Sequence, residues 1–157
     1  MTPESMDDPD LVELYAYWNE RRGTRAMPCR ADIRPSDVRG LLPHIFIADI
    51  FEPLSIKFRL VGSAICARWG INPTGRCLDE LDLDGERTRV QEQFGSVVRT
   101  GEPRYDIEEF VNDHGRYLHY RRLLLPLSDD GSKPNMLLGM QKAIGMDGYK
   151  VKFHRWV

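Results

Sequence analysis

The side chains that could do chemistry in this sequence are three cysteines, four histidines and a short run of acids. Cys29, Cys66 and Cys77 are odd in number and no two stand in a C-x-x-C spacing, which argues against a disulfide framework and a zinc finger. We therefore expect free thiols in a reducing cytoplasm. The sequence also lacks the Gly-x-Ser-x-Gly, Gly-x-x-x-x-Gly-Lys and His-Glu-x-x-His motifs of familiar enzymes.

The run of acids lies between residues 79 and 86 and consists of Asp79, Glu80, Asp82, Asp84 and Glu86. The alternative is that these acids form a cation site. The run lacks the Asp-x-Asp-x-Asp-Gly pattern of an EF-hand loop, which argues against that alternative. We interpret these acids as a solvated loop followed by the acidic first turn of a helix. The sequence therefore predicts no metal site.

The size and charge of the chain bound its class. It has 157 residues, 22 of them basic and 24 acidic, with a formal net charge of −2. That length fits one domain whose core needs neither disulfides nor a metal. A basic excess is missing, so we expect no nucleic-acid partner. No apolar stretch reaches about 18 residues and the N-terminus is acidic, so we expect no membrane contact, no secretory signal and a cytoplasmic protein.

Hydrophobic periodicity predicts a helix near the start of the chain and a longer one in its middle. Asp8 and Pro9 are a typical helix beginning, for a helix over 9–22. Its apolar residues recur at helical spacing and are Leu11, Leu14, Tyr15 and Trp18. We expect disorder over 1–8, a short helix over 63–69 and the long helix from about 84 to 100.

The remaining periodic segments have the alternation of β-strands and lie at 44–52, 56–61, 104–111, 116–126 and 135–143. Two strands, a helical crossover and three further strands predict an α+β fold: one five-stranded antiparallel sheet with helices on one face and an N-terminal helix. Such a sheet encloses a pocket between itself and its helices. The predicted domain covers 9–143. In the tail, 144–157, the apolar Tyr149, Val151 and Phe153 alternate with Lys150, Lys152 and His154.

Several segments in this order resemble a PAS domain, and more narrowly a family of small, stand-alone bacterial PAS-like proteins long described as a domain of unknown function. They span roughly 11–143 and are LYAYWNERRG (14–23), ADIRPSDVRGLLPHIFIADI (31–50), FRLVGSAI (58–65), TGRCLDEL (74–81), HGRYLHYRRLLLPLSDDG (114–131) and MLLG (136–139). The resemblance implies a sensory or protein-interaction domain and no activity. Members of the wider superfamily bind haem, flavins, small metabolites or no identified ligand.

The residues argue against two of those cofactors. Light-sensing relatives form a flavin adduct through a cysteine within Asn-Cys-Arg-Phe-Leu-Gln, whereas here Cys77 stands one position early and its neighbours differ. Haem-binding relatives take a histidine from the crossover helix, but this chain has none between 45 and 113. We therefore expect neither photoactive flavin nor haem, and we interpret His44 and His119 as structural. The identity of any other cofactor stays open.

A candidate pocket lining follows from the elements that should flank the cavity. Its members serve either as plain core or as ligand contacts, and they are Cys66, Trp69, Phe94, Tyr105, His119, Tyr120, Arg121, Met136 and Met140. Of the adjacent Arg121 and Arg122, one must point to a covered face of the sheet. We expect that arginine to pair with Glu109 or Asp106, with an anionic ligand as the alternative.

These expectations favour a non-enzymatic sensory or regulatory domain with a small ligand or none in its core. It would act by coupling the binding of that ligand to the position of a flanking helix. No kinase, cyclase or DNA-binding segment is recognised, so we expect the signal to pass to an unidentified signalling protein. One alternative is a cone-shaped isomerase or dehydratase, which needs an acid and a histidine in one pocket. The other is a ligand-free interaction module that uses the Trp18 face and the Phe153 and Trp156 tail.

The apolar stripe of the first helix must pack on something, because an isolated helix of that length is marginal in water. We predict a homodimer with residues 11–22 in its interface, through Leu11, Leu14, Tyr15 and Trp18. The alternative is that the stripe packs on the sheet of its own chain.

Overall fold

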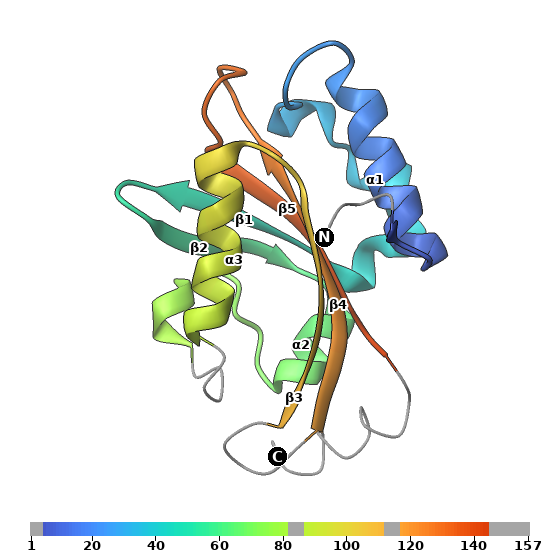
Figure 1. Cartoon of the computed structure of the whole chain (residues 1–157), viewed down its shortest axis with the longest axis vertical. Helices are drawn as coiled ribbons and strands as arrows, with labels where there is room; N and C mark the ends of the chain where they lie inside the picture. The colour runs from blue at the N-terminus through green and yellow to red at the C-terminus, as the bar shows by residue number, and fades with distance from the viewer. Residues whose placement is uncertain (1–4, 82–86, 112–116, 145–157) are drawn as a thin grey trace.

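The computed structural model describes residues 5–81, 87–111 and 117–144, which form one sheet with helices on both faces (Figure 1). The elements are α1 Pro9–Arg22, η2 Arg30–Asp32, η3 Pro35–His44, β1 Ile45–Phe51, β2 Ser55–Val61, α2 Ser63–Trp69, η4 Leu78–Glu80, α3 Arg87–Thr100, β3 Arg104–Val111, β4 Tyr117–Leu127 and β5 Met136–Ala143. The predicted order of helices and strands is confirmed. The expected start of the long helix at 84 and the tail from 145 onward lie outside the described residues.

The sheet is antiparallel throughout, with the strand order β2-β1-β5-β4-β3. Successive residues of a strand point to opposite faces, so each strand gives one set of side chains to either side. In β1, Ile45 and Ile47 belong to the apolar core under α1, whereas Phe46 and Ala48 belong to the core under α2 and α3. The predicted α+β sheet is therefore confirmed, and it separates two cores.

Helix α1 covers one face of the sheet. Asp8 caps it, because its Oδ1 accepts hydrogen bonds from the backbone N–H groups of Asp10 (2.9 Å) and Leu11 (3.3 Å). Leu11, Leu14 and Trp18 are all at most 2% exposed. The indole N–H of Trp18 donates to the carbonyl of Pro126 on β4 at 2.9 Å. The stripe of this helix thus packs on the sheet of its own chain.

The segment before α1 also contacts the sheet. Met6 is buried in the same core as Leu11 and Leu14, and Asp7 and Asp8 form ion pairs with side chains of β4 and β5. Within residues 5–8, Met6 is buried and Asp8 is half-buried, whereas Ser5 and Asp7 are exposed. The disorder that the sequence predicts over 1–8 stays a prediction. Residues 1–4 lie outside the described part of the chain.

Helices α2 and α3 cover the opposite face together with η4 (Figure 1). The apolar face of α3 has helical spacing, and its Val90, Phe94 and Val97 are at most 4% exposed. Ile65 of α2 and Leu78 of η4 join the same core. No helix in the described ranges is long and apolar enough to cross a membrane.

Candidate functional site

The candidate site is the interior between the sheet and helices α2 and α3, where four aromatic rings meet. Phe46 stacks on Phe94 with ring centroids 5.8 Å apart, and it meets Phe58 in a T-shaped pair at 5.7 Å. Trp69 packs edge-on against Phe58 at 5.8 Å. The space left free is about 10 Å³. That holds about one water molecule, whereas pockets for drug-sized ligands measure about 300–1,000 Å³.

Arg122 of β4 brings a positive charge to this interior and is 3% exposed. Its guanidinium donates to Oε1 of Gln93 on α3 at 2.6 Å and to Oε1 of Gln141 on β5 at 3.1 and 3.2 Å. It also donates to the hydroxyl of Tyr120 at 3.3 Å. Arg122 and Gln141 both line the free space. The Arg122 side chain thus links α3 to β4 and β5 by hydrogen bonds, beside the free space.

A second buried arginine joins the group from α2. The Cζ of Arg68 lies 4.4 Å from the ring centroid of Tyr120, and the Cζ of Arg122 lies 4.9 Å from the same centroid. Cation–π contacts of this kind strengthen when they are shielded from water. Gln93 extends the network by donating to Glu108 of β3. The network can donate hydrogen bonds and orient a small polar molecule.

The same stretch of sheet carries a second set of charges on the α1 face. Lys142 pairs with Asp10 at 2.7 Å and Asp8 at 3.4 Å, and Arg121 pairs with Asp7 at 3.2 Å and Asp8 at 3.6 Å. Burial by itself raises the pKa of Asp8, but the backbone N–H of Leu11 and the charge of Lys142 outweigh it and hold that pKa below its ordinary value. These pairs fasten the beginning of α1 to the sheet.

The predicted pocket residues divide between the two faces of the sheet. Trp69 and Phe94 line the free space and Tyr120 contacts Arg122 beside it. Cys66 lies on α2, where its thiol contacts the carbonyl of Val61 at 3.7 Å and burial raises the thiol pKa. On the α1 side lie Tyr105, Met136 and Met140, together with Arg121 and, by its place in β4, His119. The structure therefore does not bring the predicted set together.

The arginine pairing also differs from the expectation. Asp106 is bound by Arg104 at 2.7 Å, and Glu109 is exposed. Arg121 pairs with acids that precede or begin α1, because α1 covers the face to which Arg121 points. The prediction that Arg121 pairs with Glu109 or Asp106 on the neighbouring strand was therefore wrong.

Three polar residues of the site were missed from the sequence: Arg68, Gln93 and Gln141. Gln93 stands next to Phe94 at a helix position whose neighbours at i+1 and i+4 are buried. Gln141 continues the apolar run of β5 on the face shared with Leu137 and Gly139. A polar side chain within an otherwise apolar periodic face was the signal that could have identified both glutamines.

The two histidines considered as haem ligands lie away from the free space. His44 ends η3 and is half-buried, and burial holds its pKa below the ordinary value. His119 of β4 pairs in register with Glu109 of β3. Neither is among the residues that line the 10 Å³ space, so the structure does not bring either histidine to the candidate site.

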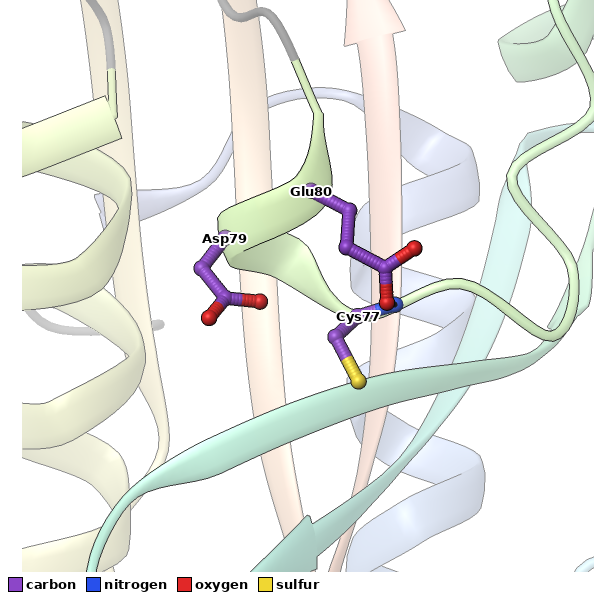
Figure 2. A group of neighbouring side chains, drawn as sticks. All are labelled: Cys77, Asp79 and Glu80. Carbon is purple, nitrogen blue, oxygen red and sulfur yellow. Dashed lines mark hydrogen bonds between the residues drawn. The ribbon is translucent and has the colours of Figure 1, made fainter.

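Cys77 belongs to a small surface cluster with Asp79 and Glu80 (Figure 2). The ligand atoms of the three residues lie within 4.8 Å of one another. Glu80 folds back and accepts a hydrogen bond from the backbone N–H of Cys77 at 3.3 Å, which caps the one-turn helix η4. Asp79 and Glu80 are exposed, and Cys77 does not line the core space. Helix capping accounts for the geometry. The remaining acids of this run lie outside the described residues.

Comparisons with known proteins agree with this architecture. A family model described as PAS domain matches residues 6–142. Among solved structures, the PAS domain of Bordetella pertussis BvgS aligns with a TM-score of 0.52 at 18% identity, over 72% of this chain and 85% of that one. A Rhodobacter sphaeroides LOV protein aligns with a TM-score of 0.51 at 13% identity, over 72% and 68%.

A light-oxygen-voltage domain studied with a flavin analogue aligns with a TM-score of 0.53 at 17% identity, over 74% of this chain and 90% of that one. These identities are low, so the solved structures show a common fold alone. The search of curated proteins finds no match. The family model covers most of the chain. The chain belongs to the PAS domain family.

Proposed function

We propose that this chain is a regulatory PAS domain with a closed core, which acts by contact with another protein and catalyses no reaction. PAS domains are in general sensory and signalling modules. The observation that supports a closed core is the free space of about 10 Å³ between four packed aromatic rings. A flavin or haem would need a cavity at least tens of times larger.

A second candidate is a sensor of a small polar molecule, and one observation favours it. Arg122 and Gln141 place hydrogen-bonding groups on the lining of the free space. A polar ligand larger than water would have to displace Phe94 or Trp69, which also line it. Displacing Phe94 would shift α3, so ligand binding and the position of α3 would be coupled.

Native mass spectrometry and an absorbance spectrum of the purified protein separate the two candidates. The closed core predicts the mass of the bare chain and no visible absorbance. Phe94→Ala, which opens the core, should bind a small apolar probe such as benzene, while the wild type should not. A stoichiometric organic ligand in the wild type would overturn the closed core and favour the sensor.

For the protein contact, we propose the homodimer through residues 11–22, now with a different set of side chains. Leu11, Leu14 and Trp18 are buried within one chain, whereas Val12 is 45% exposed and Tyr15 is half-buried on α1. A dimer through α1 would therefore use Val12 and Tyr15.

Val12→Glu is a sharper test of this dimer than Trp18→Glu, because a charge at Trp18 would disrupt the core. We expect a wild-type dimer at micromolar concentration in sedimentation velocity and a folded monomer for Val12→Glu. A monomeric wild type, or a variant that remains dimeric, would exclude α1 as the dimer element.

A further inference from the structure

Residues 21–39, which run from the last turn of α1 through η2 into η3, are rich in arginine. They hold six arginines, no lysine and only two acids, Asp32 and Asp37, whereas the whole chain has a net charge of −2. The segment folds back along α1, because η3 packs beside that helix (Figure 1). Positive charge is therefore gathered beside α1 in a protein that is negative overall.

Tyr17 of α1 connects this helix to η3. Its hydroxyl donates to Oδ2 of Asp37 at 2.8 Å and accepts a hydrogen bond from the backbone N–H of Arg34 at 2.9 Å. The Cζ of Arg21 lies 5.9 Å from the centroid of the Tyr17 ring. Arg39 follows Asp37 by two residues on η3. The contacts of one tyrosine thus bring Arg21, Arg34 and Arg39 to the same side of α1.

Asp32 of η2 adds two further arginines to this side. Its carbonyl accepts from Nε of Arg21 at 2.7 Å, and its Oδ2 lies 2.9 Å from Nη1 of Arg25. Arg30 begins η2 and donates from Nη1 to the carbonyl of Ile33 at 2.8 Å. We call the resulting group the arginine surface; its members are Arg21, Arg25, Arg30, Arg34 and Arg39.

The chain itself neutralises little of this charge. Among the described residues, Arg25 is the only member of the arginine surface that has a carboxylate partner. Arg21 and Arg30 each donate through one nitrogen to a backbone carbonyl, which orients the guanidinium without cancelling its charge. Arg34 and Arg39 are exposed, and the described ranges contain no hydrogen-bond partner for either side chain. The surface can therefore bind added anionic groups.

The chemistry of the surface favours a carboxylate-bearing protein segment as its occupant. Guanidinium groups bind carboxylates through two parallel hydrogen bonds, and groups that are already oriented lose less entropy on binding. A nucleic acid duplex is less suitable, because its phosphates extend past the arginine surface to a protein whose remaining charge is negative. An anionic membrane is less suitable, because the exposed large apolar side chains of the described residues lie outside 21–39.

We propose that the arginine surface is the docking site for an acidic segment of a partner protein. This inference rests on the proposed function, because it supplies the surface for contact with another protein. Helical spacing places Tyr17 and Arg21 on the flank of α1 opposite to Val12 and Tyr15, through which we propose the homodimer. One chain can therefore contact a second copy and the acidic segment at the same time.

An NMR titration of the full chain with acetylated, amidated hexaglutamate tests this docking site. At about 50 mM salt we expect saturable binding that moves the backbone amide signals of 17–39, and at about 200 mM salt we expect weaker binding, because salt screens exposed charges. Arg34→Glu combined with Arg39→Glu should raise the Kd about tenfold or more. Both side chains are exposed, so the variant should fold, and circular dichroism checks this.

Arg76→Glu combined with Arg99→Glu is the matched control. It changes the net charge by the same amount at two exposed positions outside 21–39, and it should leave the Kd within about twofold of the wild type. An equal loss of binding in the two double variants would overturn the proposal, since net charge alone would then explain the binding. No binding by the wild type, or signal changes spread beyond 17–39, would overturn it as well.

Two other anionic probes test the choice of occupant. A DNA duplex, or vesicles of phosphatidylglycerol, should bind more weakly than hexaglutamate at the same salt concentration. Tighter binding of either would overturn the proposal in favour of a nucleic acid or a membrane. The closed core is tested separately by native mass spectrometry, and the homodimer by sedimentation velocity, so failure of the docking site is distinguishable from failure of the proposed function.

Discussion

Gly139 of β5 lies directly opposite Phe46 of β1, and the ring of Phe46 lies over it. A Cβ atom at Gly139 would stand closer than 3.0 Å to three carbons of that ring. Unstrained carbon–carbon contacts need about 3.5–4.0 Å. The nearest of these carbons would stand 2.1 Å from the new Cβ, so we expect Gly139→Ala to force the Phe46 ring away from the sheet by more than about 1 Å.

The ring has little room to move. It stacks on Phe94 with planes 4° apart and meets Phe58 in a T-shaped contact, and the free space beside it is about 10 Å³. Overpacking of a well-filled core costs about 1–3 kcal/mol. For a chain of this size, each kcal/mol lowers Tm by about 2–4 °C. Gly139→Ala should lower the free energy of unfolding by that amount and Tm by about 2–12 °C.

Urea denaturation followed by circular dichroism measures this loss, with an unchanged m value. Gly40→Ala is the matched control, because a Cβ there meets nothing within 4 Å, and it should stay within about 0.5 kcal/mol of the wild type. The double variant Phe46→Leu with Gly139→Ala should lose about 1 kcal/mol less unfolding free energy than the two single variants lose together. If Gly139→Ala and Gly40→Ala lower the free energy of unfolding by the same amount, the Phe46 ring does not depend on the missing Cβ at position 139, and the reasoning is refuted.

Three further changes test other contacts. Arg122→Met leaves the Gln141 and Gln93 carbonyls without this donor and should cost about 1–3 kcal/mol in urea denaturation; adding Gln141→Leu should recover part of it. Trp18→Phe removes the donor to the Pro126 carbonyl and should cost about 1–3 kcal/mol by the same assay. Asp8→Asn keeps a capping oxygen but loses the ion pairs. Because the pKa of Asp8 lies below its ordinary 3.8, its charge stabilises the fold above about pH 4, and that contribution disappears as the pH falls through the folded pKa. The variant should therefore be about 0.5–1 kcal/mol less stable near neutrality and equal to the wild type in strong acid; a gap that persists in acid contradicts the ion-pair argument.

The sequence was sufficient for the elements because each carried its own local signal. Asp8 and Pro9 determined the beginning of α1, and the alternation of Ile45 to Ile50 predicted which side chains of β1 share a face. The order of strands and helices then left few arrangements for one sheet. Those steps depend on neighbours along the chain, which a sequence displays directly.

The candidate site could be predicted only in part, because a residue's face does not say what covers that face. Tyr105 and Tyr120 are equally buried tyrosines on adjacent strands, yet one packs under α1 and the other beside Arg122. The sequence shows a helix stripe at Leu11, Leu14 and Trp18 but not the surface that receives it. The volume of the free space in the core cannot be predicted from the sequence either, because the fit of Phe46 over Gly139 depends on side chains from three elements.

The ladder between β4 and β5 has apolar residues on both faces, so hydrophobicity alone does not determine which face meets α1. Arg121 opposite Lys142, and Arg122 opposite Gln141, distinguish the two faces. A slip of one residue in β5 would turn Lys142 toward the aromatic rings and Gln141 toward the acids before α1. Burying that ammonium without its carboxylates would cost several kcal/mol. The charged residues at this end of the sheet therefore act as a register mark, selecting one pairing among alternatives that bury similar apolar surface.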